Sequence, residues 1–426
     1  MTTPARNFSI AQWYTFWLGV LIFLIPSNLF LKFFESSAYV HGLLVDYLLP
    51  KLYLSDLVIF ILLGTWLVQR VINRKKFDFS VLKKNSNALL IFFTLLLLIF
   101  CRQFFTPKPF AAIWLFLKYV EMGLLAAFLL NHKELFSQRW IKICFLTMVI
   151  FQSLLAIFQF WKQSSFFPSY LFLGETRLTQ GGGIATGIFN GVEKILPYGT
   201  TAHPNILGGI LAVGVFLVLK TRDKNHGAFV WLMLGPMTIA LFLTQSISAW
   251  LILGISLLLV TRIGKKVVEK HKNRLLAGVA AASVIVIPAT LALAKIFTEN
   301  VFIYRRLVLI IASFNMAVES IIWGVGLNNF TVQLENFAPL MEVVRFVQPV
   351  HHTGLLWLAE MGLVGVGMTL SGTLLLKKKA PNLFKAVSIA TVLLLPALVF
   401  DHYLLTTQTG LLVAVFSIYG VKRVDL

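Results

Sequence analysis

The chain is 426 residues long; 58% of its residues are hydrophobic and only 13% are charged, about half the charged fraction of an ordinary soluble domain. The hydrophobic residues fall into long runs, and roughly 20 apolar residues are enough for a helix to cross a bilayer. The formal net charge of +20 would suit nucleic-acid binding, but the placement of the basic residues excludes that class and leaves a polytopic membrane protein.

Twelve apolar segments are predicted as membrane-spanning helices. The first follows a short N-terminus, is too long for a signal-peptide core and has no small-residue cleavage site after it, so we expect it to be retained. Several segments are shorter than a bilayer needs, and their true ends are expected to lie a few residues inside the neighbouring loops. In chain order the predicted spans are 13–33, 53–71, 87–101, 110–131, 141–161, 204–220, 228–243, 248–262, 276–297, 353–376, 386–400 and 405–421.

Basic residues are concentrated in alternate loops between these segments. They gather in 70–84, 133–142, 220–224, 262–274 and 377–385, and again after the last span. Because cytoplasmic loops carry an excess of lysine and arginine, this pattern places both termini in the cytoplasm and requires an even number of crossings. The basicity is therefore an orientation signal, and no nucleic-acid partner is expected.

Two long segments interrupt the alternation of helices and short loops, at about 162–203 and about 298–352. Both lie on the extracytoplasmic side in this topology. No separate soluble domain, low-complexity linker or convincing internal repeat is visible. The prediction is a single integral membrane domain over residues 1–426, all-α, with about twelve transmembrane helices and two long extracytoplasmic loops. Since the cytoplasmic loops are short and basic, chemistry is expected on the outer side.

The second long loop contains an apolar segment, 307–324, that could be mistaken for a thirteenth span. If it crossed the membrane, Lys377 to Lys379 would lie outside, against the positive-inside pattern. We predict instead an amphipathic helix along the outer surface, packed on the bundle or dipping into the membrane interface, and ended by Gly324 and Gly326. Its apolar stripe at helical spacing is Leu307, Ile310, Ile311, Phe314, Ala317, Val318, Ile321 and Ile322.

Ionisable residues flank this helix and close the loop. Arg305 and Arg306 precede it, and His351 and His352 stand just before the next predicted span. Such residues near a membrane are costly unless they are paired or used. A guanidinium binds phosphate oxygens and stabilises a departing diphosphate, and a neutral imidazole accepts a proton from a sugar hydroxyl. The alternative is that these residues anchor the chain among lipid headgroups.

Two stretches of this region resemble the O-antigen ligase and polymerase family of membrane glycosyltransferases. One begins at Arg306 and ends in the turn Gly324-Val-Gly-Leu-Asn-Asn-Phe330, similar to the family's arginine-led helix. The other runs from His351 through Glu360 and resembles the family's His-Asn, Leu, Glu, Gly signature, with His352 in place of the usual asparagine. The resemblance implies that Arg306 binds diphosphate and His351 handles the acceptor hydroxyl, while Arg305, His352 and Glu360 contribute to substrate binding.

Weaker matches occur elsewhere. The sequence His203-Pro204-Asn205 resembles the family's His-Pro-Asn helix start, which implies that His203 and Asn205 bind substrate. The alternative is a simple helix start, with Pro204 in the first turn and Thr200 or Thr201 as caps. Asp401 resembles the aspartate of a late family helix. On the fourth predicted span, Lys118 and Glu121 stand three residues apart and are interpreted as a structural pair.

One position departs from the family. Ile247 occupies the place of an arginine to which the resemblance assigns the lipid diphosphate, and isoleucine cannot bind it. Arg177, before the glycine-rich stretch 181–183, is the first candidate replacement, and Lys194, Arg305 and Arg345 are others. The departure indicates either a lost activity or a different substrate.

On this resemblance the chain is expected to transfer a glycan from undecaprenyl diphosphate to an acceptor at the outer face of the cytoplasmic (inner) membrane. An O-antigen ligase is the first interpretation, and a polysaccharide polymerase of the same family is the alternative. Its partners would be the lipid-linked glycan donor, a glycan or lipid acceptor and the membrane. No cofactor is expected, and since no acidic pair marks a metal site in either long loop, a metal-independent transfer is favoured.

Two other classes remain open. A transporter or lipid flippase also uses about twelve helices, but it should place polar groups near the midplane of broken helices, whereas here they gather in external loops. An inactive protein that only organises glycan assembly would explain why isoleucine at position 247 replaces the arginine.

Overall fold

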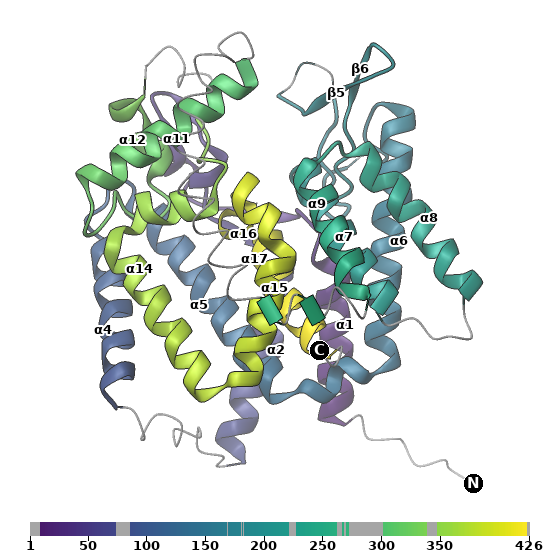
Figure 1. The fold of residues 1–426 in the computed structure, drawn as a ribbon, viewed down its shortest axis with the longest axis horizontal. Helices are drawn as coiled ribbons and strands as arrows, with labels where there is room; N and C mark the ends of the chain where they lie inside the picture. The colour runs from purple at the N-terminus through teal and green to yellow at the C-terminus, as the bar shows by residue number, and fades with distance from the viewer. Residues whose placement is uncertain are drawn as a thin grey trace. The chain divides into compact units, whose positions relative to one another are not determined.

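The computed structural model describes residues 9–73, 86–167, 169–179, 181, 183–220, 227–261, 266–267, 270–271, 301–338 and 347–423. This part of the chain is mostly helical, and a helix occupies eleven of the twelve predicted spans (Figure 1). The other, 276–297, lies outside the described residues. The first helix ends at Leu24 rather than at residue 33, because the chain turns there and continues into a short strand.

The chain forms two compact units. The first comprises Met1–Leu31, Leu52–Lys76 and Glu121–Trp250. In it, α6 packs against α1 and α8, and α7 packs against α8. Its helices are α1 (Ile10–Leu24), α2 (Leu54–Ile72), the second half of α5 (Pro109–Asn131), the short η3 (Lys133–Ser137), α6 (Arg139–Lys162), α7 (Pro204–Lys220) and α8 (Gly227–Leu243).

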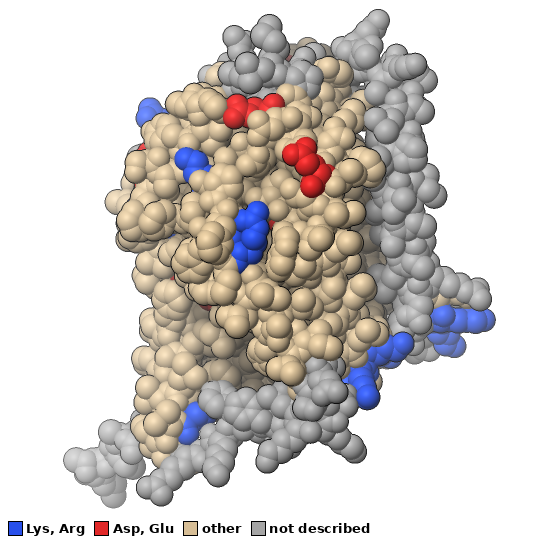
Figure 2. All heavy atoms as spheres, turned by 90° about the vertical axis from the view of Figure 1, so that its left-hand side faces the viewer, with Lys and Arg blue, Asp and Glu red and all other residues tan. Residues whose placement is uncertain are grey.

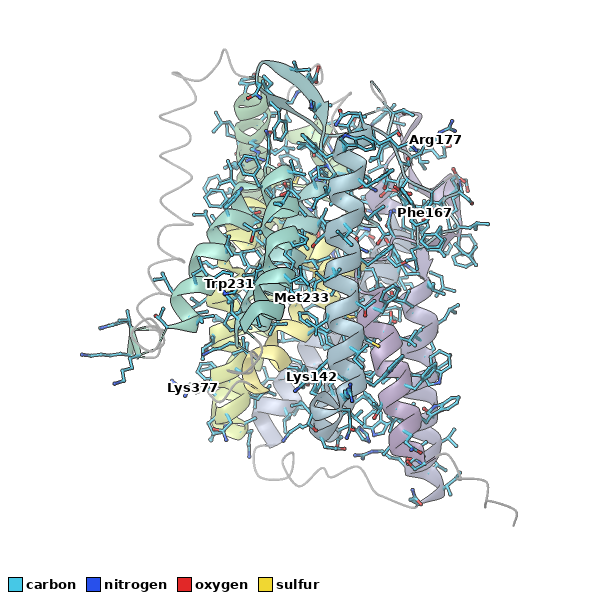
Figure 3. All side chains as sticks on the ribbon, turned by 90° about the vertical axis from the view of Figure 1, so that its right-hand side faces the viewer. Lys142, Phe167, Arg177, Trp231, Met233 and Lys377 are labelled. Carbon is cyan, nitrogen blue, oxygen red and sulfur yellow. The ribbon has the colours of Figure 1, made fainter. Side chains whose placement is uncertain are left out.

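The ends of two helices that lead into basic loops, predicted on the same side of the membrane, lie together in this unit. The Arg70 guanidinium, at the end of α2, donates to the side-chain oxygen of Asn131, at the end of α5, at 3.1 Å. Figure 3 shows Lys142 near one end of α6, and Arg177 and Phe167 toward its other end. Lys142, of a basic loop, and the first long loop therefore lie toward opposite ends of α6.

The first long loop contains a β-hairpin that an all-α prediction omits. Strands β5 (Thr186–Phe189) and β6 (Val192–Ile195) pair antiparallel, with Thr186 opposite Ile195. Asn190 and Gly191 form the turn, both with positive φ (51° and 79°), as a two-residue type I′ connection requires. Two other two-stranded sheets are smaller: β1 (Phe30–Lys32) with β4 (Lys51–Tyr53), and β2 (Tyr39–Val40) with β3 (Leu43–Leu44).

The second unit comprises Lys32–Lys51, Phe77–Val120 and Leu251–Leu426, and α9 (Ile247–Val260) crosses the boundary in sequence. Within it, α14 packs against α4, α11 and α15, and α15 packs against α17. Its elements are η1 (Glu35–Ala38), η2 (Asp46–Leu48), α4 (Ser86–Gln103), the first half of α5, α11 (Val301–Glu319), α12 (Phe330–Phe337), α14 (Thr353–Lys379), α15 (Pro381–Phe400), α16 (Tyr403–Thr406) and α17 (Gln408–Arg423).

Five of the described helices are long and apolar enough to cross a membrane: α2, α5, α6, α14 and α15. Six further apolar helices are shorter, α1, α4, α7, α8, α9 and α17. On the face drawn in Figure 2, most of the described surface carries no charged side chain, as expected for a protein surrounded by lipid. By length and composition, the chain is that of a polytopic membrane protein.

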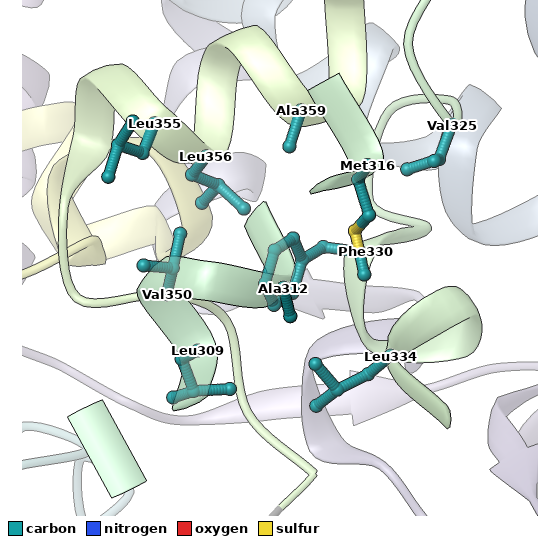
Figure 4. Packing of buried hydrophobic residues seen from close by; sticks show 10 residues of the cluster. All are labelled: Leu309, Ala312, Met316, Val325, Phe330, Leu334, Val350, Leu355, Leu356 and Ala359. Carbon is teal, nitrogen blue, oxygen red and sulfur yellow. The ribbon is translucent and has the colours of Figure 1, made fainter. Parts of the chain in front are cut away.

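The helix predicted in the second long loop is present as α11, which ends at Glu319, and its buried face matches the predicted stripe only in part. Leu309, Ala312 and Met316 face the protein and pack with Val350 and Phe330 (Figure 4). Half of the predicted stripe is exposed, namely Phe314, Val318, Ile321 and Ile322, whereas Leu307 and Ala317 are buried. Both faces of α11 are rich in apolar residues, so their periodicity did not distinguish the side that packs on the protein.

Helix α14 is interrupted at Gly362, where φ is 57° and ψ is −159°. The turn after α11 pairs with this break. The backbone N–H of Val325 donates to the Ala359 carbonyl at 2.9 Å, and that of Leu363 donates to the Ile321 carbonyl at 2.8 Å. These bonds satisfy backbone groups that the interruption removes from the helix.

Candidate functional site

Five segments of the chain meet at the end of the second unit where α14 begins. The Gln103 side-chain oxygen accepts from the Leu327 N–H at 2.9 Å, and the Asn328 amide donates to the Tyr47 carbonyl at 2.8 Å. The Thr353 hydroxyl donates to the Asp401 carbonyl at 3.0 Å. These contacts bring together segments near residues 47, 103, 328, 352 and 401, which lie far apart in the sequence.

A cluster of aromatic and imidazole rings lies in this region, and we call His351, His352, His402 and Tyr47 the histidine cluster. The rings of His351 and His402 meet edge to face, with centroids 5.1 Å apart and planes at 68°. The ring of Tyr47 meets His402 in the same way, with centroids 5.3 Å apart. His351 is half-buried, whereas His352 and His402 are buried.

The tautomer of neutral His352 follows from its hydrogen bond. Its Nδ1 accepts from the Leu355 N–H at 3.1 Å and caps α14, so Nδ1 must lack a proton and Nε2 must carry one. Only 4% of this residue is exposed, and its Nε2 has no hydrogen-bond partner among the described residues. Burial lowers the pKa of His352 below its ordinary value of 6.5, which favours the neutral ring. His352 therefore presents a buried, unused N–H donor.

The two arginines before α11 differ in exposure. Arg305 is half-buried and lies one turn before Leu309, on the face that packs with Val350, the residue before His351. Arg306 is exposed. It lies one turn before Ile310, which packs at the edge of the same cluster. Arg306 is thus accessible to a ligand, at the edge of the α11 face that packs with Val350. Arg305 is turned toward the protein.

The contacts of Glu360 are with the glycine-rich turn. Its carboxylate Oε1 accepts from the Phe330 N–H at 3.2 Å, and its carbonyl accepts from the Gly326 N–H at 3.0 Å. Glu360 is buried, with 5% exposure. Through these contacts Glu360 holds the turn that follows α11, and it joins the stretch that begins at Arg306 to the one that begins at His351.

The remaining predicted residues belong to the first unit or its loops. His203 is exposed, and its Nδ1 accepts from the Asn205 N–H at 3.1 Å, so His203 itself caps α7. The prediction of Thr200 or Thr201 as the cap is wrong. The Thr200 hydroxyl donates to the Pro26 carbonyl at 3.2 Å, and the Thr201 hydroxyl to the Tyr198 carbonyl at 2.7 Å.

The candidates for the missing arginine differ in their surroundings. Arg177 is exposed, and the Lys194 ammonium lies 5.2 Å from the centre of the Phe160 ring. Arg345 lies outside the described residues. Ile247 is 69% exposed at the start of α9, so the side chain at this position points away from the packed interior. On the fourth predicted span, Lys118 is buried with its ammonium 5.5 Å from the Trp114 ring, and Glu121 is buried as well.

Sequence reasoning missed Tyr47 and His402. The signal for His402 was present, since the polar pair Asp401-His402 interrupts two apolar runs. Tyr47 lies in a loop between the first two spans that carries no motif. Within the described ranges, no three histidine, cysteine, aspartate or glutamate side chains are grouped as a metal would require.

No protein-family model matches this chain, and no curated protein sequence matches it either.

Proposed function

We propose that this chain is a membrane-embedded glycosyltransferase that moves a glycan from undecaprenyl diphosphate to an acceptor at the outer face of the cytoplasmic membrane. The observation that carries the proposal is the direct contact between two stretches that are separate in the sequence, 306–330 and 351–365. Backbone bonds from Val325 to Ala359 and from Gly326 to Glu360 join them. One apolar cluster also packs the arginine-bearing α11 against the segment that ends in His351.

The chemistry assigns a step to each residue. The acceptor hydroxyl attacks the anomeric carbon of the donor, a new carbon–oxygen bond forms, and the imidazole of His351 takes the hydroxyl proton. The bond from the anomeric carbon to the phosphate oxygen breaks, and undecaprenyl diphosphate leaves with its electron pair. Arg306 binds the charged diphosphate, and the Nε2–H of His352 donates to an oxygen of the bound substrate.

The topology that this reaction needs is the one favoured by the basic loops. We infer twelve crossings with both termini in the cytoplasm and with the histidine cluster at the outer side. The contacts at the start of α14 support this arrangement, because every loop segment that meets there was predicted on the outer side.

Ligase and polymerase differ in their products, which a glycan profile separates. Cells carrying the wild type or a deletion are compared at matched growth. Short repeats that fail to lengthen in the deletion would identify a polymerase, and long lipid-linked chains left unattached would identify a ligase. An unchanged profile in the deletion would contradict both.

One observation favours a transporter as the second candidate. Helix α14 is broken at Gly362, and the buried Glu360 lies two residues before the break, as in transporters that bind substrates at interrupted helices. Against it, the backbone groups at the break bind residues 321–326. Movement of a lipid-linked glycan by the purified protein in proteoliposomes would favour transport.

An inactive scaffold is compatible with Ile247, because isoleucine at this exposed position cannot bind a diphosphate. A scaffold would keep pathway function when Arg306 and His351 are both replaced.

A further inference from the structure

We propose that His402 is a positioning residue that holds the ring of His351 in place for transfer. This inference rests on the proposed function, and it concerns a residue to which neither motif assigns a role. Its basis is the edge-to-face contact between the two rings, together with the contacts that fix His402 itself.

His402 is fixed through its backbone. Asp401 Oδ1 accepts from the N–H of His402 at 2.8 Å and from that of Tyr403 at 3.4 Å, which shapes the turn between α15 and α16. Asp401 is buried, and its carbonyl accepts from the hydroxyl of Thr353, in the first turn of α14. The segment that carries His402 is therefore tied directly to the one that follows His351.

The ring of His402 is fixed by Thr406. The Thr406 hydroxyl oxygen lies 2.8 Å from His402 Nδ1 and 3.2 Å from the His402 carbonyl oxygen, within hydrogen-bond distance of both. A ring held in one orientation presents a constant surface to its neighbours.

The Tyr47 ring contacts the same imidazole. Tyr47 packs at the edge of a buried cluster that includes Val45, Leu48 and Leu49, and its carbonyl accepts from the Asn328 amide. The loop after the first span thereby fixes the position of Tyr47, and the segment before α16 fixes the position of His402. The histidine that handles the acceptor is thus packed against a ring that two other segments fix.

Such support matters because transfer depends on the direction in which the His351 nitrogen points. A displacement of about 1 Å in a reacting group lowers a rate by roughly 100-fold. Phenylalanine at position 402 would keep an aromatic ring against His351 and Tyr47 but would lose both nitrogens. Alanine would remove the ring.

The test compares His402→Ala and His402→Phe in the full chain, with two measurements. The first is the rate at which diethyl pyrocarbonate modifies His351 in the purified protein, followed by mass spectrometry. The second is glycan transfer in cells per amount of folded protein. We expect His402→Ala to speed the modification of His351 several-fold and to lower transfer roughly 10- to 100-fold. His402→Phe keeps the ring packing but loses the contact with Thr406, so it should lie between the wild type and His402→Ala in both.

The matched control is His132, another histidine packed among aromatic rings, with its centroid 4.5 Å from Phe128 and 5.0 Å from Tyr14. It belongs to the other unit, and its replacement by alanine should leave both readouts unchanged.

The inference is overturned if His402→Ala folds and leaves His351 modification and transfer at wild-type levels. It is also overturned if His402→Phe folds and is as inactive as His402→Ala, since the nitrogens rather than the ring would then matter. A wild type without transfer activity, in which His402→Ala still exposes His351, would refute the proposed function while confirming the contact.

Discussion

The backbone N–H of Val325 donates to the carbonyl of Ala359 at 2.9 Å, which joins the turn after α11 to the first segment of α14. This bond exists because α14 is interrupted at Gly362, three residues further on. The helix carrying the two arginines and the helix capped by His352 are therefore held as one body, and the geometry of the candidate site depends on the interruption.

Replacement of Gly362 by alanine is expected to destabilise the protein. Its φ of 57° with ψ of −159° is a region open essentially to glycine, and a Cβ there would lie 2.6 Å from the Ile322 carbonyl carbon. Strain of this kind costs about 1–3 kcal/mol. Gly367→Ala is the control in the same helix, because a Cβ at Gly367 meets nothing within 4 Å. Thermal unfolding in detergent should show a lower Tm for Gly362→Ala only; equal values would refute the strained break.

The cap of α14 predicts different results for two replacements of His352. Asparagine is among the best N-cap residues, so His352→Asn should keep the stability of the wild type, whereas His352→Ala should lose about 0.5–2 kcal/mol. Comparing the midpoints of unfolding of the two variants in one detergent measures the difference. Equal destabilisation by both substitutions would mean that the His352 ring does not stabilise the protein by capping α14.

The lowered pKa of His352 predicts how stability depends on pH. Because burial holds this pKa below 6.5, the unfolded chain binds a proton at a higher pH than the folded protein does. Stability should therefore fall as the pH drops below about 6.5, until the folded-state pKa is passed. The loss on moving from about pH 7.5 to about pH 5.5 should be smaller in His352→Asn, which lacks this group. An identical loss in both proteins would contradict the assignment.

The inferred orientation predicts where introduced cysteines react. Asn336 in α12 and Lys377 near the end of α14 are both exposed, and they lie on predicted opposite sides of the membrane. With Cys101 and Cys144 replaced by serine, Asn336→Cys should react with a membrane-impermeant maleimide in intact cells. Lys377→Cys should react only after the membrane is opened. The reverse pattern would invert the topology.

The apolar runs predicted the helices well, because a segment that must satisfy its backbone in lipid has few structures available. The two motif stretches also led to segments that the structure joins. The sequence did not show the break at Gly362, since an isolated glycine in an apolar run is compatible with an unbroken helix. The exposed and packed faces of α11 were separated only in part because both are apolar, with Phe314 and Val318 on one and Leu309 and Met316 on the other.

Tyr47 and His402 were missed for a different reason. The role proposed for them comes from the ring contacts of His402 with His351 and Tyr47, and those contacts depend on how the loops near residues 47, 351 and 402 fold together. The hairpin of β5 and β6, in contrast, had a local signal in Asn190-Gly191 that the interpretation of the first long loop passed over.

The most direct test of the account is the glycan profile of cells whose only source of this protein is His351→Ala, at expression matched to the wild type. The control is His41→Ala, an exposed histidine in the same unit that pairs with Glu335 at 2.6 Å. The account predicts that His351→Ala folds and reproduces the profile of the deletion, while His41→Ala keeps that of the wild type. A wild-type profile from folded His351→Ala would contradict the catalytic role of this histidine and leave transport or scaffolding as the better explanation.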